Sequence, residues 1–379
     1  MQAAEAPSQS KWRFLREALA GTGQDFTQGS LSRGIALLAI PTILEMSMES
    51  LFGVVDAFWV AGLGPDAMSA VGLTEALIVL VFAVAMGLAT AASATVARRI
   101  GEKDSEGAAV AAVQGIACGI VVTIILGIAG ALAAPQLLAW MHATPGTIRI
   151  GTTYTRIVLG GNFAIVMIFL INGIFRGAGD AAIAMRTLWM ANLVNLALDP
   201  CFIFGLGPFP RLGVTGAAVA TTTGRTIGVL YQLHVLFGGT SRIAVARRHL
   251  RFDWPVLRQL LKVARTAVVQ YFISTASWMT LTRFNAGFGA AAVAGYSLAV
   301  RIILFTILPS WGICSAAATL VGQNLGARQP ERSERAVWLA GLYNMIFLTI
   351  VGIVFFLAAN PVVGLFRPGA AVIPVAVTC

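Results

Sequence analysis

Nine long runs of apolar residues dominate the chain, and each is long enough to cross a lipid bilayer as a helix. A bilayer core of about 30 Å requires about 20 apolar residues in helical form. The runs lie at residues 34–60, 68–97, 108–134, 149–174, 183–206, 213–238, 257–284, 293–320 and 333–359. The runs lack the alternating period of outer-membrane barrel strands. We therefore predict an all-α integral membrane protein with about nine full transmembrane helices.

The charged residues support this class and predict an orientation. They make up only 11% of the chain, against about 25% in soluble domains. Basic residues cluster before the first run and near residues 98–103, 176–186, 242–262 and 328–335. Because every second loop is basic, the positive-inside pattern explains the net charge of +10 better than nucleic acid binding does. We expect a multi-pass protein of the cell inner (plasma) membrane, with a cytoplasmic N-terminus and no nucleic acid partner.

The sequence also repeats itself with a shift of 225 residues. This shift places Gly87 on Gly312 and Gly101 on Gly326. It spans six helices, an even number, so both copies begin on the same side of the membrane and form two parallel six-helix-type repeats. Parallel repeats of this kind are typical of transporters.

The repeat divides the chain into four parts. They are a cytoplasmic N-terminal tail (1–32), an N-terminal six-helix bundle (33–238), a cytoplasmic basic linker (239–256) and a C-terminal bundle (257–379). The shift places Cys379 opposite Tyr154, where the fourth run of the first copy begins. We therefore expect the second bundle to be incomplete, with three helices and the start of a fourth, and the protein to be C-terminally truncated.

The first apolar run carries three carboxylates. Glu45, Glu49 and Asp56 are spaced by four and seven residues, which places them on one face of a helix. A carboxylate at the centre of a membrane costs about 3 kcal/mol, so this face is not expected to contact lipid. Such residues either hold a proton or a cation beside a cavity or form hydrogen bonds to neighbouring helices. Glu45 and Glu49 are candidates for the cavity and for substrate contact.

A second polar group lies in the fifth and sixth runs. Asn192, Asn195 and Asp199 recur every three or four residues and share one helix face. Pro200 releases a backbone carbonyl beside Asp199, and the Thr221 hydroxyl is a candidate for the same cluster. These oxygens suit Na⁺ or a proton relay, with Asn192 as a possible cavity residue. The alternative is that the proline only kinks the helix and the asparagines bridge helices.

Several motifs together resemble those of the multidrug and toxic compound extrusion (MATE) transporters. They are VVDAFWVAGLG, VARRIGEKD, IFRGAGDA, NLALDPCFIFG, RLGVTGAAVAT and VGQNLGA. The resemblance covers nearly the whole chain from about residue 33. It implies two six-helix bundles that export organic, often cationic, compounds in exchange for Na⁺ or H⁺.

The resemblance also implies a site. Asp56, Asn195, Asp199 and Thr221 match the cation and proton site of the family's first bundle. Ser274 stands where one branch of the family has a glutamate in the second bundle, and this difference favours the DinF-like branch.

Partners and alternatives follow from the same residues. We expect a monomer in the bilayer that takes small organic substrates, with Na⁺ or H⁺ as coupling ion, no cofactor, and no metal beyond Na⁺ at the first-bundle site. Arg301, within a run of the second bundle, is a candidate for substrate contact. The runs lack a nucleophile beside a base, so an enzyme is not expected. The alternative function is a flippase for lipid-linked oligosaccharides or peptidoglycan precursors, which usually needs a cationic cavity.

Overall fold

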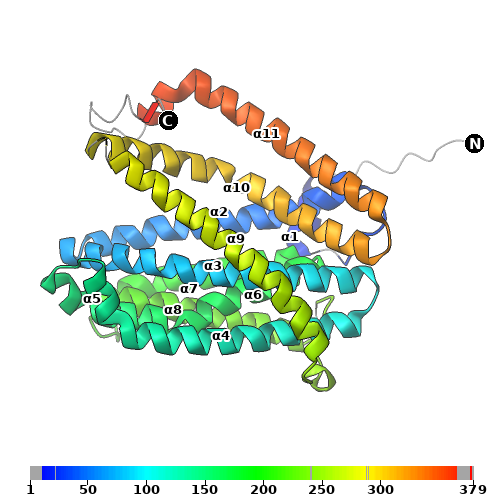
Figure 1. The fold of residues 1–379 in the computed structure, drawn as a ribbon, viewed down its shortest axis with the longest axis horizontal. Coiled ribbons are helices and arrows are strands. Elements are labelled where there is room, and N and C mark those ends of the chain that lie inside the picture. The colour runs from blue at the N-terminus through cyan, green and yellow to red at the C-terminus, as the bar shows by residue number, and fades with distance from the viewer. Residues whose placement is uncertain are drawn as a thin grey trace, which may run out of the picture.

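The protein is a bundle of long helices. The computed structural model describes residues 11–21, 23–239, 241–286, 288, 290–364 and 376–377. The helices are α1 Lys11–Ala20, α2 Leu31–Ala61, α3 Pro65–Gly101, α4 Ser105–Trp140, α5 Pro145–Gly160, α6 Asn162–Ala178, α7 Ala181–Phe204, α8 Val214–Phe237, η1 Arg247–His249, α9 Trp254–Ala286, α10 Ala290–Gly326 and α11 Pro330–Gly364. Figure 1 shows most of the long helices running along the longest axis of the molecule.

The described helices include seven segments that are long and apolar enough to cross a membrane. They are α2, α3, α4, α5 with α6, α7, the second part of α10, and α11. Helices α8 and α9 contain 24 and 33 residues, but they carry more polar side chains. The prediction of an all-helical membrane protein is therefore confirmed.

The fourth predicted run, 149–174, differs from the prediction because it is two helices. Helix α5 ends at Gly160 and α6 begins at Asn162. Two consecutive glycines have a low helix propensity, so the chain breaks there at little cost. The Asn162 side chain stabilises the break, since its Nδ2 donates to the Leu159 carbonyl oxygen at 2.6 Å.

The loops lie at two opposite ends of the bundle. One end, which we call the basic end, holds residues 102–104, 179–180, 238–239, 241–253 and 327–329. The far end holds residues 62–64, 141–144 and 205–213. In Figure 1 the basic end is on the right, beside α1.

Helix α6 forms the centre of the first bundle. Its side chains pack on α3, α4 and α8 within one large apolar core. Helix α3 approaches it closely, because a Cβ atom on Gly173 would lie 2.5 Å from the Ala89 carbonyl oxygen and one on Gly177 would lie 2.4 Å from that of Ser93. Only glycine at these positions allows the two backbones to pack at this distance.

The linker that leads to the second bundle is fixed to the first. The Arg242 amide donates to Asp180 Oδ2 at 2.9 Å, and the Val245 side chain is buried in the core of the first bundle. Further along, Gln114 of α4 donates to the Arg251 carbonyl oxygen at 2.7 Å. The linker therefore belongs to the first bundle almost as far as α9.

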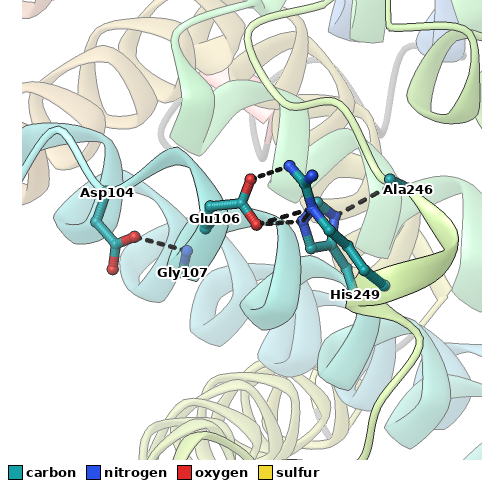
Figure 2. A network of polar contacts seen from close by, with 6 residues as sticks. Asp104, Glu106, Gly107, Ala246 and His249 are labelled. Carbon is teal, nitrogen blue, oxygen red and sulfur yellow. Dashed lines mark hydrogen bonds and ion pairs between the residues drawn. The ribbon is translucent and has the colours of Figure 1, made fainter.

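A polar network holds the middle of this linker on α4 (Figure 2). Glu106 accepts from Arg248, and its Oε2 lies 2.7 Å from His249 Nε2. The other ring nitrogen, Nδ1, accepts from the Ala246 amide at 3.0 Å. Arg248 Nε also lies 3.2 Å from His249 Nε2, so the ring connects Glu106, Arg248 and the Ala246 amide.

The segment before α2 contacts both bundles at the basic end. Asp25 pairs with Lys103 of the first bundle at 3.5 Å. Arg332 of the second bundle donates to the carbonyl oxygens of Gln28 and Gly29 at 3.0 and 2.9 Å. Partial burial acts to raise the pKa of Asp25, but hydrogen bonds from Thr27 and the charge of Lys103 outweigh it and hold this pKa below its usual value. The ionised carboxylate therefore keeps its partner.

The two bundles meet along glycines that lie between the basic end and the middle of α3 and α10, which we call the glycine seam: Gly87, Gly101, Gly312, Gly322 and Gly326. A Cβ atom on Gly101 would lie 1.9 Å from the Gln323 carbonyl oxygen, and one on Gly326 would lie 2.1 Å from that of Arg98. The 225-residue shift turns the first contact into the second.

The same reciprocity holds one layer further into the bundle. A Cβ atom on Gly87 would lie 2.3 Å from Val268 Cγ2, and one on Gly312 would lie 2.5 Å from Ile43 Cγ1. The shift again exchanges the two contacts. The fifth seam residue, Gly322, faces Ala97, and these two positions are each other's equivalents under the shift. The bundles therefore touch through matched surfaces.

Replacing Gly101 with alanine is expected to lower stability by about 1–3 kcal/mol, because the added methyl group meets a backbone oxygen that has no rotamer to change. Thermal unfolding in detergent measures this as a lower midpoint. Gly72→Ala in the same helix is the matched control, since no atom lies within 4 Å of the added Cβ; it should be neutral or stabilising. Equal midpoints for both variants would contradict the close contact at the seam.

Candidate functional site

Polar side chains of the first bundle form three layers along α2, α6, α7 and α8. The outer layer is Asp56, Asn195, Asp199 and Thr221; the middle layer is Glu49, Asn192 and Arg225; the inner layer is Glu45, Asn172, Arg176 and Gln232. On α2, Glu49 and Glu45 lie about 10 Å and about 16 Å along the axis from Asp56. The layers therefore run from the outer carboxylates toward the basic end.

The outer layer connects α7 to α8. Asp199 is fully buried and Asn195 is nearly so. The Asn195 amide satisfies both neighbours when its Nδ2 donates to Asp199 Oδ2 at 2.9 Å and its oxygen accepts from the Thr221 amide at 2.7 Å. In either orientation the amide lies 3.1 Å from Thr221 Oγ1. Three of the predicted residues are thus brought together.

Small residues and a proline create this meeting point. A Cβ atom on Gly224 would lie 2.6 Å from the Ala191 carbonyl oxygen, so α8 packs directly on the backbone of α7. Pro200 lies inside α7 and removes one backbone hydrogen bond of that helix. Asn195 and Asp199 lie one turn apart and face α8. They therefore lie close to the carbonyl group that Pro200 leaves without its usual donor.

Two carboxylate oxygens of the outer layer are left without partners. Asp56 Oδ1 and Asp199 Oδ1 are buried and have no hydrogen-bond partner among the described residues. An unpaired buried oxygen of this kind is costly. The arrangement of two carboxylates, an amide and a hydroxyl suits a hard cation or a proton. The described residues contain no group of three or more His, Cys, Asp or Glu side chains that suits a metal ion.

The middle layer is an ion pair with an amide. Arg225 Nη2 donates to Glu49 Oε1 at 2.8 Å, and Asn192 Nδ2 donates to Glu49 Oε2 at 3.0 Å. The guanidinium group lies over the rings of Phe82 and Phe169, at 5.8 and 5.9 Å from their centroids. The hydrogen bond to the carboxylate and the contacts with the aromatic rings both stabilise a cation that is removed from water.

The inner layer is more deeply buried. Arg176 Nη1 and Asn172 Nδ2 donate to Glu45 Oε1 at 2.8 and 2.9 Å. Gln232 extends the network by donating to Asn172 Oδ1 at 2.6 Å. Glu45 is 0% exposed, so the Glu45 carboxylate is balanced by Arg176 and closed to other molecules in this conformation.

These contacts place most of the predicted site residues. Glu45 and Asn192, which were candidates for a cavity, are buried, whereas the Glu49 side chain keeps 22% of its surface exposed. Arg301 lies in α10, but its side chain is outside those that the structure describes. Asp56 Oδ1 is buried and makes no hydrogen bond to the other outer-layer residues in the described structure.

Sequence reasoning missed the two arginines and two further residues. Arg176 was counted with a basic loop near 176–186, but it lies in the last turn of α6 and pairs with Glu45. Arg225 stands inside an apolar run, and an intramembrane charge of that kind is itself a signal of function. Tyr154, which is buried, and Glu75 lie near Asp56. Their spacing along the chain gives no signal.

The family of the protein follows from comparison with known proteins. The protein-family model MatE matches residues 41–201 and 266–379, which is more than half of the chain. The chain therefore belongs to the MATE family of membrane transporters, as the motifs predicted, and is a transporter rather than an enzyme.

Curated relatives agree with this assignment. The chain is 25% identical over 338 residues to the probable multidrug resistance protein NorM of Thermotoga maritima, covering 89% of this chain and 73% of the relative. It is also 25% identical over 344 residues to the FAD transporter of Shewanella oneidensis, covering 87% and 75%.

Solved structures agree as well. A MATE crystal structure in complex with MaL6 is 30% identical with a TM-score of 0.85, covering 91% of this chain and 77% of that chain. A MOP superfamily transporter from Pyrococcus furiosus, whose binding pocket is described as having reverse polarity, is 30% identical with a TM-score of 0.84, covering 93% and 78%.

Proposed function

We propose that the protein is a secondary active antiporter that exports organic, often cationic, compounds in exchange for Na⁺ or H⁺, and that it acts as a monomer. The observation that carries this proposal is the pair of buried, unpartnered oxygens on Asp56 and Asp199. A cation or proton that binds there relieves the cost of both. The relatives named as multidrug resistance proteins support the substrate class.

The ion site of this proposal is Asp56, Asn195, Asp199 and Thr221. We infer membership of the DinF-like branch, in which coupling lies in the first bundle. The support is that Ser274 of α9 carries no charge, whereas the first bundle holds the buried carboxylates. The flippase alternative gains less support, because Arg176 and Arg225, the cations of the first bundle's polar layers, are each paired with a glutamate.

The test is transport in inverted membrane vesicles from cells that make the protein. With high Na⁺ or high H⁺ in the lumen, the fluorescent cation ethidium should accumulate there, and an ionophore that collapses the gradient should stop it. Vesicles without the protein are the control. Gradient-independent movement of a lipid-linked pyrophosphate, without ethidium transport, would support the flippase. Movement of FAD without ethidium transport would still support antiport, but it would contradict the proposed substrate class.

We also propose that the basic end faces the cytoplasm. In a cysteine-free background, cysteine at Ser69, near the far end, should react with an impermeant thiol reagent added to intact cells. Cysteine at Lys103 should react only after the cells are opened. Both side chains are exposed, whereas the neighbouring Ala67 is buried and unsuitable. This orientation is expected because basic loops are retained in the cytoplasm. The reverse labelling pattern would overturn it.

We further propose that the complete transporter has three more helices in the second bundle. The most apolar part of α11 has none of its residues buried, and Phe356 and Leu357 are 88% and 76% exposed. Three further helices would pack on this face, which lipid otherwise contacts. Residues 1–379 should therefore export ethidium more slowly, and unfold at a lower temperature, than the same residues followed by the C-terminal residues of the Thermotoga maritima relative that lie beyond its match to this chain. Equal transport and equal unfolding temperatures would contradict the proposal.

A further inference from the structure

Arg225 of the middle layer lies between two sets of carboxylates. On one side it pairs with Glu49 at 2.8 Å. On the other side it lies one helical turn from Thr221 on the same face of α8, so it is next to the outer layer. Arg225 is 6% exposed, and its positive charge is therefore little screened by water.

Arg225 also has unused hydrogen-bonding capacity. Only Nη2 donates to Glu49, while Nε and Nη1 are buried and have no partner among the described residues. The outer layer shows the complementary deficit, since Asp56 Oδ1 and Asp199 Oδ1 lack donors there. Unused donors and unused acceptors thus lie in adjacent layers of one bundle. Buried groups of both kinds gain free energy when they meet.

We propose that Arg225 is a built-in competitor of the coupling cation. When the cation or proton occupies the outer layer, Arg225 pairs with Glu49. When the ion leaves, the guanidinium turns part of its charge and its free donors toward Asp56 and replaces the lost positive charge. Glu49 and Asn192 hold the arginine in the middle layer between these events. Arg225 is accordingly a positioning residue that weakens ion binding and speeds ion release.

This role rests on the proposed ion-coupled antiport, and it predicts opposite effects for the two members of one ion pair. Arg225→Gln removes the competing charge, so the outer layer should bind cations about tenfold more tightly, the effect of one unit charge two helical turns, or about 11 Å, away at an effective dielectric constant of about 20. Glu49→Gln removes the group that holds Arg225 back, so cation binding should weaken by about tenfold for the same reason.

The measurement is equilibrium binding to the purified protein in detergent. Radioactive Na⁺ is titrated at alkaline pH, and carboxylate protonation is followed by infrared spectroscopy over a pH series without Na⁺. The variants are Arg225→Gln, Arg225→Lys, Glu49→Gln and the double variant Glu49→Gln with Arg225→Gln. Lysine keeps the charge and should stay within about threefold of the wild type. The double variant should resemble Arg225→Gln, because in this proposal Glu49 acts through Arg225, and it leaves no buried charge unpaired. A double variant that binds like the wild type would show that each charge acts on the ion directly, and would refute the competitor role.

A control for the loss of one positive charge is Arg335→Gln on α11, where the side chain is exposed and lies outside the polar layers. It should shift cation binding by less than about twofold, because the removed charge is distant and screened by water. If Arg225→Gln and Glu49→Gln shift binding in the same direction, or if neither shifts it, the role of Arg225 is refuted and the antiport stands. If the wild type binds neither Na⁺ nor protons at Asp56 and Asp199, the proposed function itself fails.

Discussion

Replacing Asp199 or Asp56 with asparagine is expected to abolish ion-coupled export. Each change removes one of the two charges that the coupling ion neutralises in the outer layer. A loss of about a hundredfold in transport rate corresponds to about 2.7 kcal/mol of lost ion binding, a small value for a buried carboxylate. Ethidium transport in inverted vesicles, driven by a Na⁺ or H⁺ gradient, measures the loss.

The control for this experiment is Glu334→Gln on α11, where an exposed carboxylate is replaced. It should leave transport at the wild-type level. The amount of each variant in the membrane is equalised by fluorescence of a fused reporter. Undiminished gradient-driven export by both aspartate variants at equal abundance would show that the outer layer is not the coupling site.

Replacing Arg176 with alanine is expected to give the largest loss of stability. Glu45 is fully buried, and its Oε1 accepts from Arg176 at 2.8 Å. Removing the cation leaves the charge of Glu45 without its counter-charge in the interior. Breaking a buried ion pair in this way costs about 3–5 kcal/mol. Thermal unfolding in detergent should show a large fall in the midpoint.

A double variant separates charge from packing. Arg176→Met combined with Glu45→Met removes both charges and keeps similar volumes, so most of the lost stability should return. The expected order of midpoints is wild type or double variant first and Arg176→Ala last. If the double variant unfolds at the same temperature as Arg176→Ala, the loss comes from packing, and the ion pair is not the cause.

The helices of this protein are largely predictable from its sequence. An apolar run of bilayer length has few structures open to it, because the lipid core supplies no partners for the backbone. The periodicity of polar residues within such a run then indicates which of them share a face. Asn195 and Asp199 are an example, since both face α8, where Thr221 lies. The helix break at Gly161 is harder to predict, because its only sequence signal is the pair of adjacent glycines at residues 160 and 161.

The partners of the acidic residues are not predictable in the same way. Arg176 and Arg225 lie 131 and 176 residues from the glutamates that they bind. Periodicity describes one helix and carries no information about which helices pack together. The sequence therefore showed a stripe of three carboxylates on α2. The structure pairs Glu45 and Glu49 with arginines. Asp56 Oδ1 and Glu45 Oε2 are both buried without a hydrogen-bond partner among the described residues, but the Glu45 charge is balanced by Arg176.

The contact between Ala97 and Gly322 has a mechanical consequence. The 225-residue shift maps this contact onto itself, so we infer that an axis relating the two bundles passes through it. From this point to the far end, α3 and α10 each extend 32 residues, to Pro65 and Ala290. Each lever is then about 48 Å long. A change of about 10° in the angle between α3 and α10 at this contact moves their far ends apart by about 8 Å, the width of a small organic molecule.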